Sequence, residues 1–229
     1  MLAAIEVSTR ISSVALLDLV TGEEIAEVAL SPDWESSVTL IPALETLLTE
    51  KGFSAQDLAG VAVSTGPGSF TGIRVGLATA EGLCMPGNLL AFGISTLEGL
   101  AENLRAAELT GEALCLLDAQ RGECFVGHYE IGKDSSKELS PPQILPFEQF
   151  YKLLKGKVWV VGPGALRYEK EIRESLGTMG MFAFTSLHQP RAMSIARLAY
   201  QEWRAGLRPT LDQLKPLYLR PPAVDEKGS

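Results

Sequence analysis

The chain of 229 residues contains 46% apolar and 21% charged residues, a composition typical of a globular protein with a substantial core. Its net charge of −8 argues against binding nucleic acid alone, because neutralising phosphates requires clustered Lys and Arg side chains. No apolar run approaches the ~18 residues that a membrane-spanning helix needs, and the opening MLAAIEVSTR lacks the basic start of a signal peptide. We therefore expect a cytoplasmic protein with no membrane partner.

The chain begins with an antiparallel meander followed by a helix. Three apolar or alternating runs separated by polar turns predict strands at residues 2–8, 12–18 and 23–30. Apolar side chains then recur at helical spacing from Ser37 to about Lys51, and Pro42 is expected to kink that helix.

Residues 60–108 predict a strand, a helix, a second strand and a second helix. The run 60–64 is short and apolar, and a helix is expected from about Thr71. A strand at 88–95 then leads into a helix whose start, Ser95 followed by Glu98, has the spacing of a capping box.

From about Thr110 the same pattern begins again. Residues 113–131 predict two strands joined near Gln120, and 134–146 reads as a polar connection containing prolines. The remaining expected elements are a helix at 147–155, a strand at 157–162, a helix from Ala165, a helix at 193–205, a strand at 216–220 and a disordered tail at 221–229. An acid ends the first strand of each half, Glu6 and then Asp118, so we predict two similar α/β halves, 1–104 and 105–229.

The stretch STGPGSFTGIRVGLATAEGLC at residues 64–84 raises the question of phosphate binding. A P-loop requires a lysine, which this stretch lacks, and Gly66, Gly68 and Gly72 give GxGxxxG, one residue longer than the dinucleotide fingerprint. Backbone amides at the helix start could still hold an anion. Phosphate binding is therefore the disfavoured interpretation.

The small residues of the helix suggest a second purpose. Gly72, Gly76 and Ala80 are spaced by four, so they lie on one face where another backbone can approach closely. The helix is apolar nearly all round and needs cover on more than one side. Its own sheet and the helix 37–50 can supply that cover, or another protein can. If another protein covers the helix, a bulky residue at Gly76 would block docking and leave the fold intact.

These motifs resemble the TsaB (YeaZ) family, which acts in bacterial biosynthesis of threonylcarbamoyladenosine in tRNA. The resemblance rests on GPGSFTGIRVGLATAEGL, IEVSTRISSVALLD, SSVTLIPALETLL, ISTLEGLA, LLDAQRGECF and PLYLR. It implies the two-domain α/β fold of the actin, sugar-kinase and heat-shock ATPase (ASKHA) superfamily. It also implies a non-catalytic subunit that supports TsaD, together with the ATPase TsaE. TsaD transfers threonylcarbamoyl from its adenylate to N6 of adenosine 37 in tRNAs that read ANN codons.

The resemblance further implies where partners and ligands bind. Two helices, about Ser37–Leu48 and Thr71–Cys84, would pack against TsaD or against a second copy in a homodimer. The interface residues expected from it are Val38, Ile41, Pro42, Glu45, Leu48, Ser69, Phe70, Thr71, Gly72, Arg74, Val75, Gly76, Thr79, Ala80 and Leu83. A vestigial nucleotide site would comprise Glu6, Ser8, Thr9 and Asp118. ATP or ADP and a metal would belong to the partner subunits, and tRNA would be met only through the complex.

Two departures from the family pattern and two alternatives remain. The family usually opens with IDTST, whereas this chain has IEVST with Glu6, and Ser36 stands where many relatives have His. A nucleotide-dependent kinase or ATPase would use Glu6 or Asp118 to hold a magnesium–nucleotide. A peptidase would need a nucleophile beside a base, and His128 and His188 lack such a context. Neither His has metal-ligand spacing, and the three cysteines are expected to be core thiols.

Overall fold

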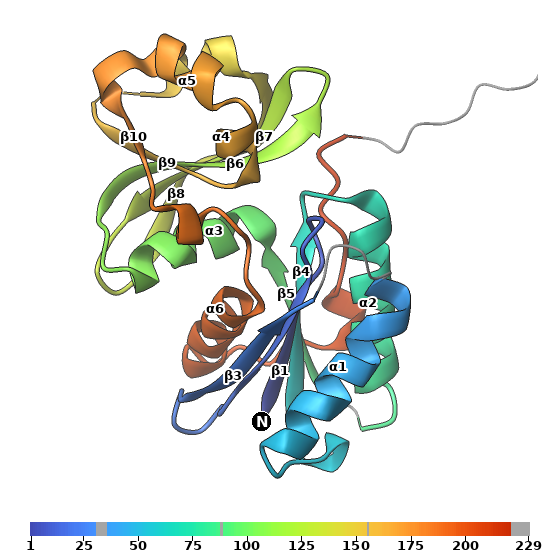
Figure 1. The fold of residues 1–229 in the computed structure, drawn as a ribbon. Helices are drawn as coiled ribbons and strands as arrows, with labels where there is room; N and C mark the ends of the chain where they lie inside the picture. Colours follow the sequence, from blue (N-terminus) through green and yellow to red (C-terminus); the bar gives the residue numbers. More distant parts are fainter. Residues whose placement is uncertain (31–35, 88, 155, 221–229) are drawn as a thin grey trace, which may run out of the picture.

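The protein folds into two lobes, each built on a five-stranded mixed sheet (Figure 1). The structure is a computed structural model that describes residues 1–30, 36–87, 89–154 and 156–220. The strands of the first sheet are β1 (Leu2–Glu6), β2 (Ser13–Leu17), β3 (Glu24–Ala29), β4 (Gly60–Gly66) and β5 (Leu90–Ser95). Those of the second are β6 (Gly111–Gln120), β7 (Glu123–Ile131), β8 (Ser136–Pro146), β9 (Val158–Val161) and β10 (Gly180–Phe182).

The two sheets share one topology, which confirms the predicted repetition of an α/β half. The first has the order β3-β2-β1-β4-β5, and the second, read from β8, has the order β8-β7-β6-β9-β10. In each, the first three strands are antiparallel and the last two run parallel to the first. The last two strands of each sheet follow a helical connection, as a parallel crossover requires.

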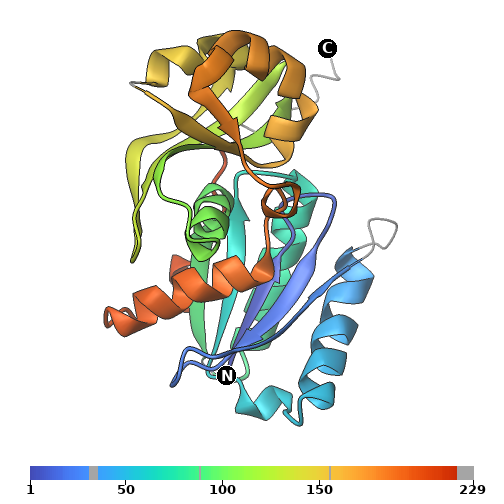
Figure 2. The ribbon, with the colours of Figure 1, turned by 60° about the vertical axis from the view of Figure 1, so that its left-hand side comes forward.

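Helices cover both faces of the first sheet. The α-helices are α1 (Ser36–Glu50), α2 (Phe70–Cys84), α3 (Thr96–Ala106), α4 (Pro163–Arg167), α5 (Glu169–Leu176) and α6 (Ala192–Arg204). Alternate strand residues face opposite ways: Ile5 and Val63 pack with α1 and α2, whereas Ala4 and Phe92 pack with α6. The C-terminal helix thus returns to the first lobe, although it follows the second sheet in the chain (Figure 2).

Helices α3 and α6 occupy exchanged positions at the junction of the lobes. Leu97 and Leu100 of α3, which follows the first sheet, pack against Cys115 and Tyr129 of the second sheet. Helix α6, which follows the second sheet, packs on the first. The two helices also contact each other, since the Cδ1 atom of Ile195 lies 3.0 Å from the position of a Cβ atom at Gly99. The other face of the second sheet is covered by α4, α5 and the 3-10 helix η2 (Phe147–Leu153).

The segment 134–146 is strand β8 and not the predicted connection. Strand β8 lies at the edge of the second sheet, and in the described part of the chain it pairs only with β7. A proline whose nitrogen faces away from β7 therefore removes no hydrogen bond between strands. The register of β8 shifts between the pairs Val126–Gln143 and His128–Ser140, so Pro141 and Pro142 oppose a single residue in a bulge.

Three smaller expectations also differ from the structure. Residues 216–220 form no strand; Leu217 donates one backbone hydrogen bond of 2.8 Å to Thr65, and the preceding Pro216 has no N–H group to extend a ladder. Ser95 precedes α3 without a capping hydrogen bond from its side chain, because its hydroxyl is turned into the protein interior. The expected helix at 147–155 is the 3-10 helix η2. The predicted disorder of 221–229 lies outside the described residues.

Candidate functional site

The loop Gly66–Gly68 between β4 and α2 is closed by the chain's own backbone. The amide of Ser69 donates to the carbonyl oxygen of Ser8 at 2.7 Å, and the hydroxyl of Ser69 accepts from the amide of Gly72 at 3.2 Å. Gly66 has a φ of 110°, and a Cβ atom there would lie 2.9 Å from the carbonyl oxygen of Leu217. The glycines therefore accommodate close backbone neighbours, and two of the donors that a phosphate would need are already used.

A second Gly-Pro-Gly turn, residues 162–164, repeats this arrangement in the second lobe. It follows β9 as residues 66–68 follow β4, and Gly162 has a φ of 114°. A Cβ atom at Gly162 would clash with the carbonyl oxygen of Leu116, and one at Gly164 would lie 2.9 Å from the carbonyl carbon of Leu117. The repeated tripeptide, Gly66–Gly68 and then residues 162–164, is a sharper signal of duplication in the sequence than the hairpins.

The glycine stripe of α2 is covered by its own sheet, so Gly76 and Ala80, which were predicted at the partner interface, are not available to a partner. Gly76 and Ala80 are buried. A Cβ atom at Gly76 would clash with Cγ2 of Val7 and would lie 3.2 Å from Cγ2 of Val63, while one at Gly72 would clash with the carbonyl oxygen of Val7. The close backbone approach predicted from the spacing is therefore real, but it occurs between α2 and the first sheet of the same chain.

The outer face of α1 and α2 is exposed and partly apolar. Val38 is 64% exposed, Ile41 46% and Phe70 37%, and around them lie the exposed residues Pro42, Glu45, Ser69, Thr71 and Arg74. Val75, Thr79 and Leu83 are half-buried, and Leu48 is buried. A shallow hollow of about 350 Å³ lies on α1 beside Pro42 and Glu45. We name the exposed residues of this set the α1/α2 face; their contact with a partner stays a prediction.

One member of the surface beside α2 was missed because residues 216–220 were interpreted as a strand. The Tyr218 ring contacts that of Phe70 in a tilted arrangement, with centroids 5.2 Å apart, and its hydroxyl accepts a hydrogen bond of 3.3 Å from Nε of Arg74. The guanidinium of Arg74 lies 3.9 Å from the centroid of the Phe70 ring. The signal in the sequence was an aromatic residue in a segment too rich in proline to form a ladder.

The acid of the candidate nucleotide site is enclosed. Glu6 is fully buried, and its Oε1 atom accepts hydrogen bonds from the amide of Ser8, at 2.6 Å, and from the Ser8 hydroxyl. Burial raises the pKa of Glu6 to about 7, because desolvation penalises the charged form more than the hydrogen bonds favour it. Glu6 cannot reach solvent, and its raised pKa leaves part of the carboxyl protonated near neutral pH, so it is poorly placed to bind a metal ion.

Thr9 and Asp118, two further members of the candidate nucleotide site, bond to residues other than Glu6. Thr9 accepts a hydrogen bond of 2.5 Å from the amide of Gln189. Asp118 in the second lobe accepts one of 3.0 Å from the Tyr168 hydroxyl and pairs with Arg167 at 3.1 Å. Of the other three predicted residues, only Ser8 is hydrogen-bonded to Glu6, so the structure brings together two of the four.

The two histidines, His128 and His188, lie beside different groups, and none of their described hydrogen bonds joins a candidate nucleophile. Nε2 of His128 lies 2.7 Å from Oε1 of Glu112, and the buried His188 bonds through its two ring nitrogens to Gly162 and Ala183. Within the described ranges, no group of three or more His, Cys, Asp or Glu side chains could hold a metal ion. The three cysteines are free and buried, as predicted, and burial raises the pKa of Cys84 to about 11.

The described part of the chain contains no helix long and apolar enough to cross a membrane. Residues 32–203 match the family model of TsaD, tRNA N6-adenosine threonylcarbamoyltransferase. The chain is similar to the tRNA threonylcarbamoyladenosine biosynthesis protein TsaB of Bacillus subtilis (strain 168), with 30% identity over 222 residues that cover 95% of this chain and 93% of that protein.

Two solved structures extend these similarities to three dimensions. YeaZ from Pseudomonas aeruginosa superposes with a TM-score of 0.83 and 25% identity, covering 95% of this chain and 99% of that one. Component A of the (R)-2-hydroxyglutaryl-CoA dehydratase of Acidaminococcus fermentans superposes with a TM-score of 0.52 at 12% identity, covering 87% and 97%, which is a likeness of fold alone. Together with the two matching sheets, these superpositions confirm the predicted two-lobe ASKHA fold.

Proposed function

Because the chain belongs to the TsaB family and carries a TsaD-type domain, we propose that it is the non-catalytic subunit that binds and supports TsaD in tRNA modification. In this proposal TsaD transfers threonylcarbamoyl from its adenylate to N6 of adenosine 37 in tRNAs that read ANN codons. The observation that carries the proposal is the α1/α2 face, where Val38, Ile41 and Phe70 remain exposed in a chain that matches TsaB relatives over nearly its whole length.

The exposed apolar side chains favour a protein partner over a small ligand. Helix α1 presents Val38 and Ile41 outward, and the adjacent α2 presents Phe70. Leu40 and Leu44 of α1 fill the core beneath them. Apolar side chains gathered on one face of a monomer are typical of a docking surface. The hollow at Pro42 and Glu45 is shallow and open, and it offers little enclosure for a metabolite.

The residues that could perform chemistry are engaged inside the chain, which supports an accessory role. Metal-assisted transfer needs an open coordination position with at least two or three protein ligands. His128 and His188 bond to different partners, and Glu6 is buried beside Ser8. A nucleotide-dependent enzyme built on Glu6 would require the acid to leave the core, so this alternative is the weaker one.

The proposal assigns cofactors and RNA to the complex. ATP or ADP and the metal belong to TsaD and TsaE, tRNA is met only through the assembled subunits, and the cytoplasm is where tRNA would be encountered. The net charge of −8 supports this division, because the phosphates of tRNA repel a subunit of net negative charge.

The proposal is tested by mixing the purified chain with its cognate TsaD and measuring mass by light scattering, with and without nucleotide. We expect a complex whose mass exceeds that of either protein alone. In a reconstituted assay with TsaE, tRNA and enzymatically made threonylcarbamoyl adenylate, omitting the chain should lower formation of the modified nucleoside. No complex under any nucleotide condition would overturn the proposal, as would full modification in the absence of the chain.

A further inference from the structure

The chain crosses between the two lobes at two places that lie close together. The first crossing joins β5 to α3 at residues 95–96, and the second leads from the second sheet into α6 at Ala192. Helices α3 and α6 contact each other near these starts, since a Cβ atom at Gly99 would lie 3.0 Å from Cδ1 of Ile195. Two adjacent crossings form a pivot about which two lobes can rotate, as in hinged two-domain proteins.

A third connection lies on the opposite face of the first sheet. Residues 209–220, which we name the strap, follow α6 and pass β5 at the sheet edge, where the amide of Ala91 donates to the carbonyl oxygen of Pro209 at 3.1 Å. Beyond that edge Leu211 and Leu214 pack with α1 and α2, whereas α6 covers the other face. Figure 1 shows the strap on the α2 side of the junction, away from α3 and α6. The first sheet therefore separates the strap from the pivot.

The strap is firmly seated on the first lobe. Leu214 is buried in the core that α1 and α2 share with the first sheet. The amide of Leu217 donates to the carbonyl oxygen of Thr65 at 2.8 Å, and the Tyr218 ring lies 5.2 Å from that of Phe70. Apolar burial and a backbone hydrogen bond thus fix this end of the strap.

The strap ends on the second lobe through a single side chain. The guanidinium of Arg220 donates to the carbonyl oxygen of Ala119 at 2.9 Å and pairs with the carboxylate of Glu123. Ala119 and Glu123 flank the turn between β6 and β7. The two paired side chains are 36% and 34% exposed, and ion pairs so exposed are individually weak. This end of the strap can therefore release while Leu214 stays buried.

We propose that the strap holds the two lobes at a fixed angle about the α3/α6 pivot, and that losing the Arg220 contacts lets the lobes rotate. A restraint far from an axis resists rotation more than one close to it, because the same rotation separates its two ends further. Relative motion is the ordinary expectation for two lobes joined by short crossings, so a fixed angle needs such a restraint. The strap acts within the chain and does not depend on the proposed function.

A purely structural role for the strap would need only its first half. Leu211 and Leu214 complete the core of the first lobe, and neither contact requires the chain to reach the second lobe. Arg220 extends beyond that core to the β6–β7 turn. A variant at Arg220 therefore separates the two roles: it leaves the buried anchor in place and removes the contact between the lobes.

The test measures the distance between the lobes by pulsed electron paramagnetic resonance of nitroxide labels. The labels are attached to Glu81→Cys in α2 and Lys170→Cys in α5, two exposed positions on different lobes, and the buried native cysteines should not react. The parent chain should give one narrow distance distribution, and Arg220→Ala should widen it about twofold or more. Arg220→Lys should fall between them, since it keeps the charge without the planar fork.

Two controls accompany these variants. Arg204→Ala removes an exposed guanidinium that donates to Tyr200 on its own helix, and it should leave the distribution unchanged. A second label pair, Val20→Cys with Glu81→Cys, lies within the first lobe and should report the same distance in every variant.

Two results would overturn the strap. The first is an unchanged distribution between the lobes in Arg220→Ala. The second is equal widening of the label pair within the first lobe, because residues 209–220 would then support that lobe and not the angle between lobes. Glu123→Gln removes the same ion pair from the other side, so it should also widen the distribution, by less than Arg220→Ala because the contact with Ala119 remains.

Discussion

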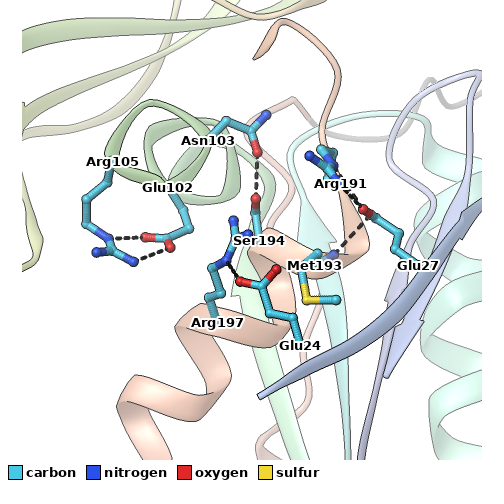
Figure 3. A network of polar contacts seen from close by, with 9 residues as sticks. All are labelled: Glu24, Glu27, Glu102, Asn103, Arg105, Arg191, Met193, Ser194 and Arg197. Atoms are coloured by element: carbon cyan, nitrogen blue, oxygen red, sulfur yellow. Dashed lines mark hydrogen bonds and ion pairs between the residues drawn. The ribbon is translucent and has the colours of Figure 1, made fainter. Parts of the chain in front are cut away.

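Asn103 on α3 and Ser194 on α6 are joined by a buried hydrogen bond of 2.5 Å, although the two residues belong to helices that follow different sheets (Figure 3). The same Asn103 side chain donates to the carbonyl oxygens of Leu187, at 2.9 Å, and Gln189, at 2.8 Å. One amide thus satisfies three groups at the junction where the lobes exchange helices. The exchange joins the two lobes more firmly than a single linker would.

We expect Asn103→Ala to lower the free energy of unfolding by about 2 kcal/mol or more, because it leaves two half-buried carbonyl oxygens and the buried Ser194 hydroxyl without this partner. Ser194→Ala removes one donor and should cost less, about 1 kcal/mol. The double variant should cost less than the sum of the two, since both changes break the same bond. Urea denaturation measures all three; strict additivity would show that this bond does not couple the helices.

The orientation of α2 predicts opposite effects for two glycines on one helix. Gly76→Ala should destabilise the fold by about 1–3 kcal/mol, because its Cβ atom would clash with Val7 in a packed core. Gly82→Ala, also on α2, places its Cβ atom in open space and should stabilise by about 0.5–1 kcal/mol. Thermal denaturation compares the two variants. Equal effects of both substitutions would mean that α2 is not seated on the sheet through Gly76.

The strands and helices of the first lobe could be predicted because the relevant signals are local. The apolar run at 13–17, helical spacing at 36–50 and the Gly-Pro-Gly turn each specify an element through nearby residues. The wrong expectations depended on distant contacts. Whether Pro141 and Pro142 end a strand or form a bulge depends on their place at a sheet edge, which the local sequence does not encode.

The same limit applies to the candidate site. Spacing placed Gly72, Gly76 and Ala80 correctly on one face of a helix, but spacing cannot say whether that face meets its own sheet or a partner. Arg74 was expected at the interface, whereas its aromatic neighbour Tyr218 lies 144 positions along the chain. Only the return of the C-terminal segment past α2 brings them together.

Charge on the α1/α2 face should weaken the complex and spare the fold. Ile41→Asp places a carboxylate where an apolar side chain is 46% exposed, so desolvating it on docking should reduce TsaD affinity by about tenfold or more. Val20→Asp, at a turn position that is 81% exposed on the same lobe, is the matched control and should bind normally. Titration calorimetry with TsaD measures both. Normal binding by Ile41→Asp would place the docking surface elsewhere on the molecule.

Glu6 predicts a pH-dependent contribution to stability. Burial raises its pKa in the folded state to about 7 from the ordinary value of 4.5, so the folded state holds the proton more tightly than the unfolded state. Below about pH 4.5 the carboxyl is protonated in both states and contributes nothing. As pH rises from there to about 7, the unfolded state loses the proton first, and the free energy of unfolding falls by up to about 3 kcal/mol.

Glu6→Gln removes this ionisation while leaving an oxygen to accept from Ser8. The variant should therefore be more stable than wild type at pH 8, with an advantage that shrinks steadily and disappears near pH 4.5. Glu98, whose pKa burial also raises to about 7, contributes equally to both proteins and cancels in the comparison. Glu81→Gln on the exposed face of α2 is the control and should change stability little at either pH. Urea denaturation across this range measures the difference; an offset that does not vary with pH would mean that Glu6 is ionised in the folded protein, and would reopen its candidacy as a metal-binding acid.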